Sequence, residues 1–419
     1  MLVVAAMVVY FQQKSITVAS ERIMPALSLS QVQIGWLQWA FVVAYGFFQV
    51  PGSIWGQRLG ARKALAVTSA VAILACAALP LAPKLLTGTA LFAAMFLSQF
   101  ILGLAHAPFF PLCAGVMESW LPPRLWSLVQ GIQTCGCQVG AAIAPPLLTA
   151  LISVFNWQSA LFIAAWPPVL GLILWWVYAR NTPQEHPSLT VEEKKAFRET
   201  LPPDTQISFK SWLAIVGQRP VWAMAASYVC MNYLFYLLAN WTFLFLIQQR
   251  HFSVFESSWI AAIPPMGAAV GAGLGGGLTM IAVRYLGDTW GYRLMPMVMI
   301  PSAGALLWLA IVSNSAMVAV GALAVSYFLV ELSEGAYWGG AMRVAGAETM
   351  AVAGIVNTGG NLGGVIGIPI VAYLSAAGRW DIAFGLGFVF AIVAALLWLY
   401  VDVEHPIPQS GLRTSDAMS

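Results

Sequence analysis

Ionisable side chains that interrupt long apolar segments are the residues of this sequence most able to do chemistry. Lys14, His106, Glu331 and Glu334 stand in segments otherwise built from Ala, Val, Leu, Ile, Phe and Gly. An ionisable group in hydrocarbon is costly, so it normally faces the interior of a helix bundle or a water-filled cavity. Their placement therefore predicts a solute pathway through a membrane protein.

Glu331 and Glu334 are two carboxylates one helical turn apart. Mutual repulsion and desolvation both disfavour their charged forms, so the pair is expected to hold one proton near neutral pH. Such a site suits proton coupling or substrate binding. The alternative is a buried ion pair, in which Lys14 or Arg343 neutralises one carboxylate. His106 is a second candidate for proton coupling, because histidine changes charge between about pH 5 and 8.

The composition predicts a membrane protein. Of the 419 residues, 60% are hydrophobic and 8% are charged, and the mean hydropathy is +0.80, whereas a soluble domain carries about 25% charged residues. A helix that spans the bilayer needs about 20 mostly apolar residues. Twelve such stretches predict an all-α protein with twelve transmembrane helices. They lie near residues 1–22, 35–55, 64–82, 88–117, 127–153, 158–179, 221–246, 257–283, 294–313, 316–342, 350–376 and 381–401.

Several functional classes find no support in the sequence. It contains no pairing of a nucleophile with a base and no cluster of metal ligands, so we expect neither an enzyme nor a metal or cofactor site. The five cysteines lie inside the apolar stretches and are interpreted as small buried hydrophobes. No nucleic-acid partner is expected.

The basic residues predict the orientation of the chain. With the N-terminus in the cytoplasm, fourteen of the 19 Lys and Arg fall on the cytoplasmic side and four on the outside, and Lys14 lies within the membrane. The positive-inside rule then puts both termini in the cytoplasm. Met1 leads directly into an apolar run without a basic segment, so no cleaved signal peptide is expected and the native start can lie upstream.

One long polar stretch divides the chain. Residues 181–218 are rich in Pro, Glu and Lys and separate six predicted helices from six. The two halves then have the same orientation, as in transporters whose halves are related by an axis along the membrane normal. The prediction is an N-terminal bundle (1–180), a cytoplasmic linker (181–218), a C-terminal bundle (219–401) and a cytoplasmic tail (402–419). Such a linker joins bundles that rock against each other, although a simple tether has the same composition.

Local motifs in both halves resemble the major facilitator superfamily. Residues 51–63 are similar to its loop motif, Gly-x-x-x-Asp-Arg-x-Gly-x-Arg-Lys, at Gly60, Arg62 and Lys63. Four further segments resemble the anion:cation symporter family within that superfamily, and the resemblance extends from about residue 10 to about residue 398. These segments are Phe-Phe-Pro at 109–111, Ala-Pro-Pro at 144–146, Tyr-Val-Cys-Met-Asn at 228–232 and Asn-Thr-Gly-Gly-Asn-Leu-Gly-Gly at 357–364.

The resemblance implies two six-helix bundles, a transporter and a mechanism of alternating access. The branch includes bacterial hexonate, hexuronate and aromatic-acid permeases and sialin-like carriers. It therefore implies proton-coupled symport of a small organic acid across the bacterial inner (plasma) membrane. The implied partners are the substrate, a co-transported proton and the lipid bilayer, around a monomer without a cofactor.

Two pairs of family positions in the first half differ in this chain. Where the family has Asp-Arg late in the first helix, this sequence has Gln12 and Gln13, followed by Lys14. Where the family has an Arg on the fourth helix and a Glu seven residues later, this sequence has Gln99 and His106. These differences weaken the implication of an anionic substrate.

The acid of the loop motif is also replaced. Its position holds Gln57, and the counterpart in the second half is Met280. Without the acid we expect the cytoplasmic gate to be held less firmly. The predicted gating residues are Gly52, Arg58, Gly60, Arg62, Lys63 and Arg343.

Polar residues recur at helical spacing on the first, fourth, seventh and tenth predicted helices, which line the central cavity in this superfamily. Side chains three or four residues apart share one face of a helix. We expect Lys14 to contact the negative group of the substrate or a glutamate of the tenth helix. Asn232 and Asn240 can instead form hydrogen bonds between helices. The predicted substrate-binding residues are Gln13, Lys14, Gln99, His106, Gln138, Asn232, Tyr236, Asn240, Trp338, Asn357 and Asn361.

Two other functions fit the same residues. An exporter of cationic or amphipathic compounds would suit Glu331, Glu334 and an aromatic cavity. A transporter-like sensor, which binds a solute without moving it, would suit the replacements at Gln57 and Gln99.

Overall fold

The computed structural model describes residues 1–121, 123–194, 218–345 and 349–403. Within these ranges the chain is helical and no residue forms a strand, which confirms the predicted all-α class. The first half contains α1 (Leu2–Leu27), α2 (Gln31–Phe47), α3 (Gln49–Leu59), α4 (Ala61–Leu85), α5 (Gly88–His106), α6 (Phe109–Trp120), α7 (Pro123–Val154), α8 (Trp157–Ala164), α9 (Pro168–Tyr178) and the 3₁₀ turn η1 (Pro183–Glu185). The second half contains α12 (Arg219–Arg250), α13 (Val254–Ile260), α14 (Ile263–Val312), α15 (Ala316–Ala345), α16 (Thr349–Ala376), α17 (Trp380–Leu397) and the 3₁₀ turn η3 (Trp398–Tyr400).

These helices account for the twelve predicted membrane spans. By length and hydropathy, ten helical stretches among the described residues qualify as spans. One of them, Val254–Val312, is 59 residues long, which is enough for two crossings of a bilayer. The remaining span consists of α2 and α3, which are separated at Phe48 and are each too short to qualify alone.

The loop predicted between residues 283 and 294 is not formed. Instead, α14 continues through this region and leaves helical geometry only at Gly287 (φ 77°, ψ 169°). Gly60 has the same kind of backbone (φ 85°, ψ 139°) between α3 and α4. Because only glycine adopts these angles readily, one residue turns the chain at each site without a loop. The residues between the two predicted spans lie on helix ends beyond the apolar stretches.

One end of the bundle carries several helix N-termini with side-chain caps. Ser30, Asn156 and Ser253 each accept a hydrogen bond from a backbone N–H in the first turn of the helix that follows. Such caps satisfy N–H groups that lack a partner within the helix. We call this end of the bundle the capped end, and the opposite end, which carries residues 179–194, the linker end.

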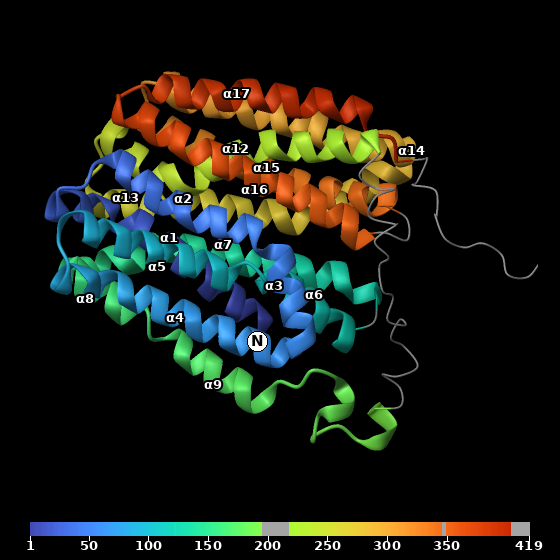
Figure 1. Ribbon diagram of the computed structural model, residues 1–419. Helices are drawn as coiled ribbons and strands as arrows, with labels where there is room; N and C mark the ends of the chain where they lie inside the picture. Colours follow the sequence, from blue (N-terminus) through green and yellow to red (C-terminus); the bar gives the residue numbers. More distant parts are fainter. Residues whose placement is uncertain (122, 195–217, 346–348, 404–419) are drawn as a thin grey trace, which may run out of the picture.

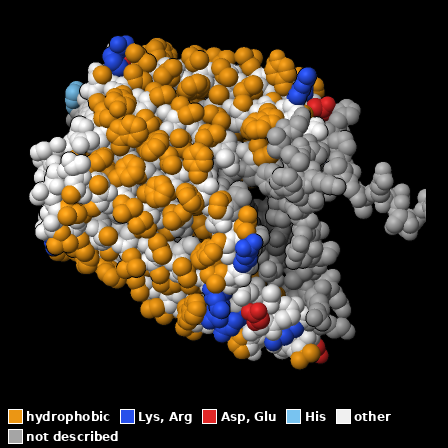
Figure 2. All heavy atoms as spheres, viewed as in Figure 1, with side chains coloured by type: hydrophobic (Ala, Val, Ile, Leu, Met, Phe, Trp, Pro, Cys, Tyr) orange, Lys and Arg blue, Asp and Glu red, His pale blue; other side chains and the backbone are white. Residues whose placement is uncertain are grey.

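The two halves lie side by side with their helices in roughly the same direction, the blue-to-green helices of the first half mostly below the yellow-to-red helices of the second (Figure 1). They meet where α2 packs against α16 and where α7 packs against α14. Small residues allow the close approach: a Cβ added to Gly35 on α2 would lie 2.3 Å from the Cβ of Ala372 on α16. Hydrophobic side chains cover much of the outer surface, as a lipid environment requires (Figure 2).

The halves are joined at the capped end. There, Nε2 of Gln31 donates to Oγ of Ser375 at 2.6 Å, and Nε2 of Gln248 donates to Oε1 of Gln31 at 3.1 Å. Farther along α2 from the capped end, Nε1 of Trp39 donates to the carbonyl oxygen of Val365 at 2.9 Å. At the linker end, Figure 2 shows the surface recessed between the halves, beside the undescribed residues drawn in grey. The structure is therefore closed at the capped end and recessed at the linker end.

Candidate functional site

A cavity lies in the middle of the molecule, where α1, α2 and α5 of the first half face α12 of the second. Five of the predicted substrate-binding residues line it: Gln13, Lys14, Gln99, Tyr236 and Asn240. The structure thus brings these five residues together from three helices. The rest of the lining, which the prediction did not single out as a site, is Tyr10, Ile16, Thr17, Gln38, Phe41, Val42, Tyr45 and Phe235.

Lys14 is the charged residue of this cavity. Its side chain is 8% exposed, and its Nζ donates a hydrogen bond of 3.0 Å to Oδ1 of Asn240 across the interface between the halves. Removing an ammonium group from water costs several kcal/mol unless an opposite charge is near. Lys14 belongs to none of the ion pairs found among the described residues. In this structure it therefore contacts an amide, and not a glutamate of the tenth predicted helix, which was one of the two partners expected for it.

Aromatic rings line the cavity on both sides. Phe41 and Tyr45 on α2 are stacked, with ring centroids 5.8 Å apart and an interplanar angle of 12°. On α12, Phe235 and Tyr236 meet edge to face at 5.3 Å. Ring faces offer apolar contact, and the phenol groups of the tyrosines can donate or accept hydrogen bonds. The cavity therefore combines one cation with apolar faces and neutral polar groups.

Two predicted residues of α16 support the cavity from outside. The phenol of Tyr236 donates to Oδ1 of Asn361 at 3.0 Å. Nδ2 of Asn357 donates to Oε1 of Gln49 at 2.5 Å, which joins α16 to the first half. Asn361 and Asn357 do not line the cavity; they orient Tyr236 and connect the helices around it.

Glu331 is buried between the two halves. Its side chain is 3% exposed, and its Oε1 accepts a hydrogen bond of 2.9 Å from Nε2 of Gln138 on α7. The alternative prediction of an ion pair does not describe this structure, because Lys14 contacts Asn240 and Arg343 contacts Asp288. Among the described residues, the one polar partner found for the Glu331 carboxyl is thus an uncharged amide.

Glu334 has a different environment although it lies one turn away. Its carboxylate accepts hydrogen bonds from the phenol of Tyr228, at 2.8 and 3.0 Å to its two oxygens. Nε1 of Trp338 donates to Oε2 at 2.7 Å, and the Trp338 side chain is 38% exposed. The two carboxylates therefore have separate partners, and Glu334 is the more accessible of the two.

His106 lies within the first half. Its Nε2 is 3.1 Å from Oε1 of Gln12, which is an acceptor only, so Nε2 carries the hydrogen in this contact. Nε2 of Gln12 and Nδ1 of His106 are buried and have no partner among the described residues. His106 does not line the central cavity, but Gln12 lines a second one.

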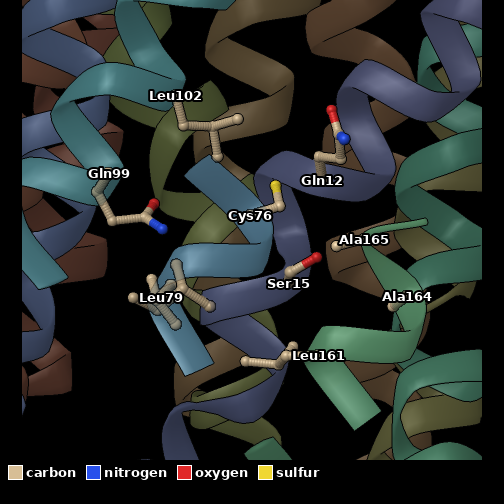
Figure 3. A pocket seen from close by; sticks show the side chains of 10 residues that line it. Gln12, Ser15, Cys76, Leu79, Gln99, Leu102, Leu161, Ala164 and Ala165 are labelled. Carbon is tan, nitrogen blue, oxygen red and sulfur yellow. The ribbon is translucent and has the colours of Figure 1, made fainter. Parts of the chain in front are cut away.

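This second cavity, which we call the rear cavity, lies inside the first half (Figure 3). It is lined by residues of α1, α4, α5 and α8 and the residue after α8. Gln99 lines both cavities, and Figure 3 shows its amide on α5 close to Leu79 of α4. The rear cavity therefore leaves space behind one wall of the central cavity.

Asn232 lies at a contact between helices. Its Nδ2 donates to the carbonyl oxygen of Tyr228 in the same helix at 2.9 Å. It packs against the glycine-rich face of α16, where a Cβ added to Gly363 would lie 2.9 Å from the Cβ of Asn232. The structure thus places Asn232 beside α16 rather than in the cavity lining.

The predicted gating residues of the first half surround the turn at Gly60. The backbone N–H of Arg62 donates to Oδ1 of Asn181 at 2.9 Å, and its guanidinium donates to the carbonyl oxygen of Trp176 at 2.5 Å. Arg58 and Lys63 are exposed, and the side chain of Gln57 lies outside the described part of the structure. Gly52 packs against Pro108, to which an added Cβ would be 3.1 Å distant.

In the second half, Arg343 forms an ion pair with Asp288, which follows the turn at Gly287. Asp288 and Asn181 are not predictable as partners from the sequence, because both lie between the predicted helices. Tyr228, Gln12 and Gln38 were likewise not among the predicted site residues. The pattern that could have identified these three residues is the helical spacing of polar groups in apolar segments, which also identified the predicted site residues.

Comparisons with known proteins agree with this architecture. A family model described as Major Facilitator Superfamily matches residues 2–345. The probable sulfoacetate transporter SauU of Cupriavidus necator is 23% identical over 415 residues, which cover 96% of this chain and 94% of that protein. The hexuronate transporter of Bacillus subtilis is 23% identical over 414 residues, covering 97% and 94%. The chloroplastic ascorbate transporter of Arabidopsis thaliana is 25% identical over 382 residues, covering 88% and 68%.

Solved structures share the fold at low sequence identity. The crystal structure of the D-xylose-proton symporter has a TM-score of 0.74 at 11% identity and covers 96% of both chains. A bacterial homolog of the human lysosomal transporter Spinster, in an inward-facing and occupied conformation, has a TM-score of 0.70 at 16% identity. That match covers 96% of this chain and 95% of the other.

Proposed function

The chain belongs to the Major Facilitator Superfamily, and we propose that it carries a small organic anion across a membrane by alternating access, in symport with protons. The observation that carries this proposal is Lys14. A lysine buried in a cavity between the two halves, with an amide as its partner, provides a positive charge that a solute can neutralise. Relatives named as transporters of sulfoacetate and hexuronate, both of which are acids, agree with an anionic solute.

The carboxyl of Glu331 is the candidate for the coupling proton. It is buried at the interface between α15 and α7, and the partner it has there is a neutral amide. Protonation removes a charge from this interface, and deprotonation restores it. A change in charge at the contact between the halves would alter how stable that contact is, which is the requirement for linking proton movement to rearrangement.

Alternating access would exchange one set of contacts for another. The hydrogen bonds of Gln31 with Ser375 and Gln248 join the halves at the capped end. Opening this end requires those bonds to break while the recess at the linker end closes. One chain supplies both halves of the cavity, so the proposal requires only a monomer.

The orientation belongs to the same proposal. We place both termini in the cytoplasm of a bacterium, with the protein in the inner membrane, because the basic residues concentrate at the linker end. The recess at the linker end would then face the cytoplasm, and the capped end would face outside.

Purified protein in proteoliposomes tests the function. We expect uptake of a labelled organic acid to exceed its equilibrium concentration when the exterior is acidic, and to stop at equilibrium when a protonophore removes the pH gradient. Lys14→Ala should abolish this uptake. The matched control is Lys84→Ala at the end of α4, which removes a lysine from outside the cavity.

The same experiment separates the two alternatives. Proton-driven movement of an organic cation, with no movement of acids, would favour the exporter that the exposed Trp338 beside Glu334 could serve. Binding of an acid to the purified protein without any movement across the vesicle would favour the sensor.

A further inference from the structure

One side chain determines the charge of the central cavity. Among the described lining residues, Lys14 is the only Lys, Arg, Asp or Glu. The other polar lining groups are amides, phenols and one hydroxyl, which can bind an oxygen atom but cannot neutralise a full charge. Nζ of Lys14 donates one hydrogen bond to Asn240 and has two further hydrogens to donate.

The acidic residue across the interface, Glu331, cannot neutralise a negative group on the solute. Glu331 lies outside the lining and accepts a hydrogen bond from Gln138. When it is ionised, it repels an anion, and when it is protonated, it is neutral. A first negative group on the solute therefore has Lys14 as a partner, whereas a second has none. An unpaired charge in a site of low dielectric constant costs several kcal/mol.

We propose that the substrate carries a single negative charge, and that the cavity rejects dianions of the same size and carbon skeleton. This inference rests on the proposed transport of an organic anion and specifies its charge. The remainder of the solute is then neutral. The stacked rings of Phe41 and Tyr45 would cover its C–H groups, and the amides of Gln13 and Gln38 would bind its hydroxyl oxygens.

Gln99 is a residue at which this selectivity can be relaxed. It lines the central cavity together with Lys14 and also borders the rear cavity. Gln99→Arg adds a second positive charge to the lining. We expect this variant to accept dianions.

The test uses two pairs of solutes that differ by one charge. Gluconate and glucarate share a six-carbon skeleton with one and two carboxylates, and 2-hydroxyethanesulfonate and sulfoacetate share a two-carbon skeleton with one and two anionic groups. Binding to the full-length purified protein is measured by calorimetry at pH 7, and uptake is measured in proteoliposomes. For the wild type we expect the dianion of the preferred pair to bind about 100-fold more weakly than the monoanion.

Gln99→Arg should reduce this ratio to about 10-fold or less. Gln99→Met, which has a similar length and no charge, should leave the ratio unchanged. Equal binding of both members of a pair by the wild type, or preference for the dianion, would overturn the single-charge inference while leaving anion transport intact. If no anion of either pair binds and an organic cation such as tetraethylammonium does bind, the proposed function is overturned as well. If Gln99→Arg does not fold, the wild-type comparison of the two pairs still decides the inference.

Discussion

Lys14 and Asn240 connect the first helix of one half to the first helix of the other through a single hydrogen bond of 3.0 Å between Nζ and Oδ1. Both side chains line the central cavity and both are buried. The bond therefore lies at the place where a solute would enter between the halves. A solute oxygen that replaced Oδ1 of Asn240 would change this link between them.

The charge of Lys14, rather than its volume, should determine substrate affinity. Asn240→Asp keeps the shape of residue 240 but pairs Lys14 with a carboxylate, so we expect it to weaken binding of a monoanion by about 10- to 100-fold. Asn240→Ala leaves the charge of Lys14 available and should weaken binding by less than about 10-fold. Titration calorimetry on the purified variants measures both effects. Equal losses for the two variants would mean that Asn240 itself, not the charge of Lys14, determines affinity.

Replacement of the two carboxyls on α15 should separate transport from proton coupling. The Glu331→Gln, Glu334→Gln double variant should lose accumulation driven by a pH gradient and keep exchange of substrate down its own gradient. Since glutamine still offers an oxygen to Gln138 and to Tyr228, the fold should be retained.

Glu331→Gln alone should account for most of this loss, because Glu331 is buried with one donor, whereas Glu334 has Tyr228 and Trp338. Glu334→Gln is the matched control. Uptake and counterflow in proteoliposomes measure the two activities. If the double variant still concentrates substrate with the pH dependence of the wild type, the coupling site lies elsewhere and His106 is the next residue to test.

A clash at the capped end should shift the protein toward the conformation that is open there. In Gly35→Ala the new Cβ would lie 2.3 Å from the Cβ of Ala372, closer than two carbon atoms can pack. We expect longer distances between spin labels placed across the capped end. Adding Ala372→Gly removes the second Cβ and should restore the distances of the wild type. A change that persists in the double variant would indicate distortion of α2 rather than separation of the halves.

Gly60 and Gly287 should tolerate alanine poorly for reasons of backbone conformation. Their φ values of +85° and +77° lie in a region that L side chains rarely adopt, at a cost of about 1–3 kcal/mol each. Gly60→Ala should cost more, since its Cβ would also lie 2.9 Å from the amide of Asn181, whereas the space around Gly287 is open. Thermal unfolding in detergent measures the difference.

Gly321→Ala is the control for these variants. It lies inside α15 with nothing within 4 Å of an added Cβ, and alanine favours a helix over glycine by about 1 kcal/mol. Its melting temperature should equal or exceed that of the wild type. A lower melting temperature for Gly321→Ala would show that loss of glycine, rather than the positive φ, is responsible.

Much of the fold could be predicted from the sequence because membrane helices are specified locally. A run of about 20 apolar residues must form helix in hydrocarbon, where its backbone groups have no other partner. The gap between the predicted spans that end at residue 283 and begin at residue 294 is not a loop. The end of an apolar run marks where a segment leaves the apolar layer, not where its helix ends. One glycine with positive φ was enough to reverse the chain there.

The sequence by itself determined which residues are costly to bury, because the cost of burial depends on residue type. It also determined on which helices they lie, because position on a helix depends on spacing along the chain. The tertiary structure decided what each of them contacts. Lys14 and Asn240 are 226 residues apart, and Gln138 and Glu331 are 193 apart. Such pairs depend on how helices from different halves are rotated and packed, which no local pattern specifies. Lys14 therefore faces an amide and a solute cavity instead of a glutamate, and that contact is a property of the assembled bundle.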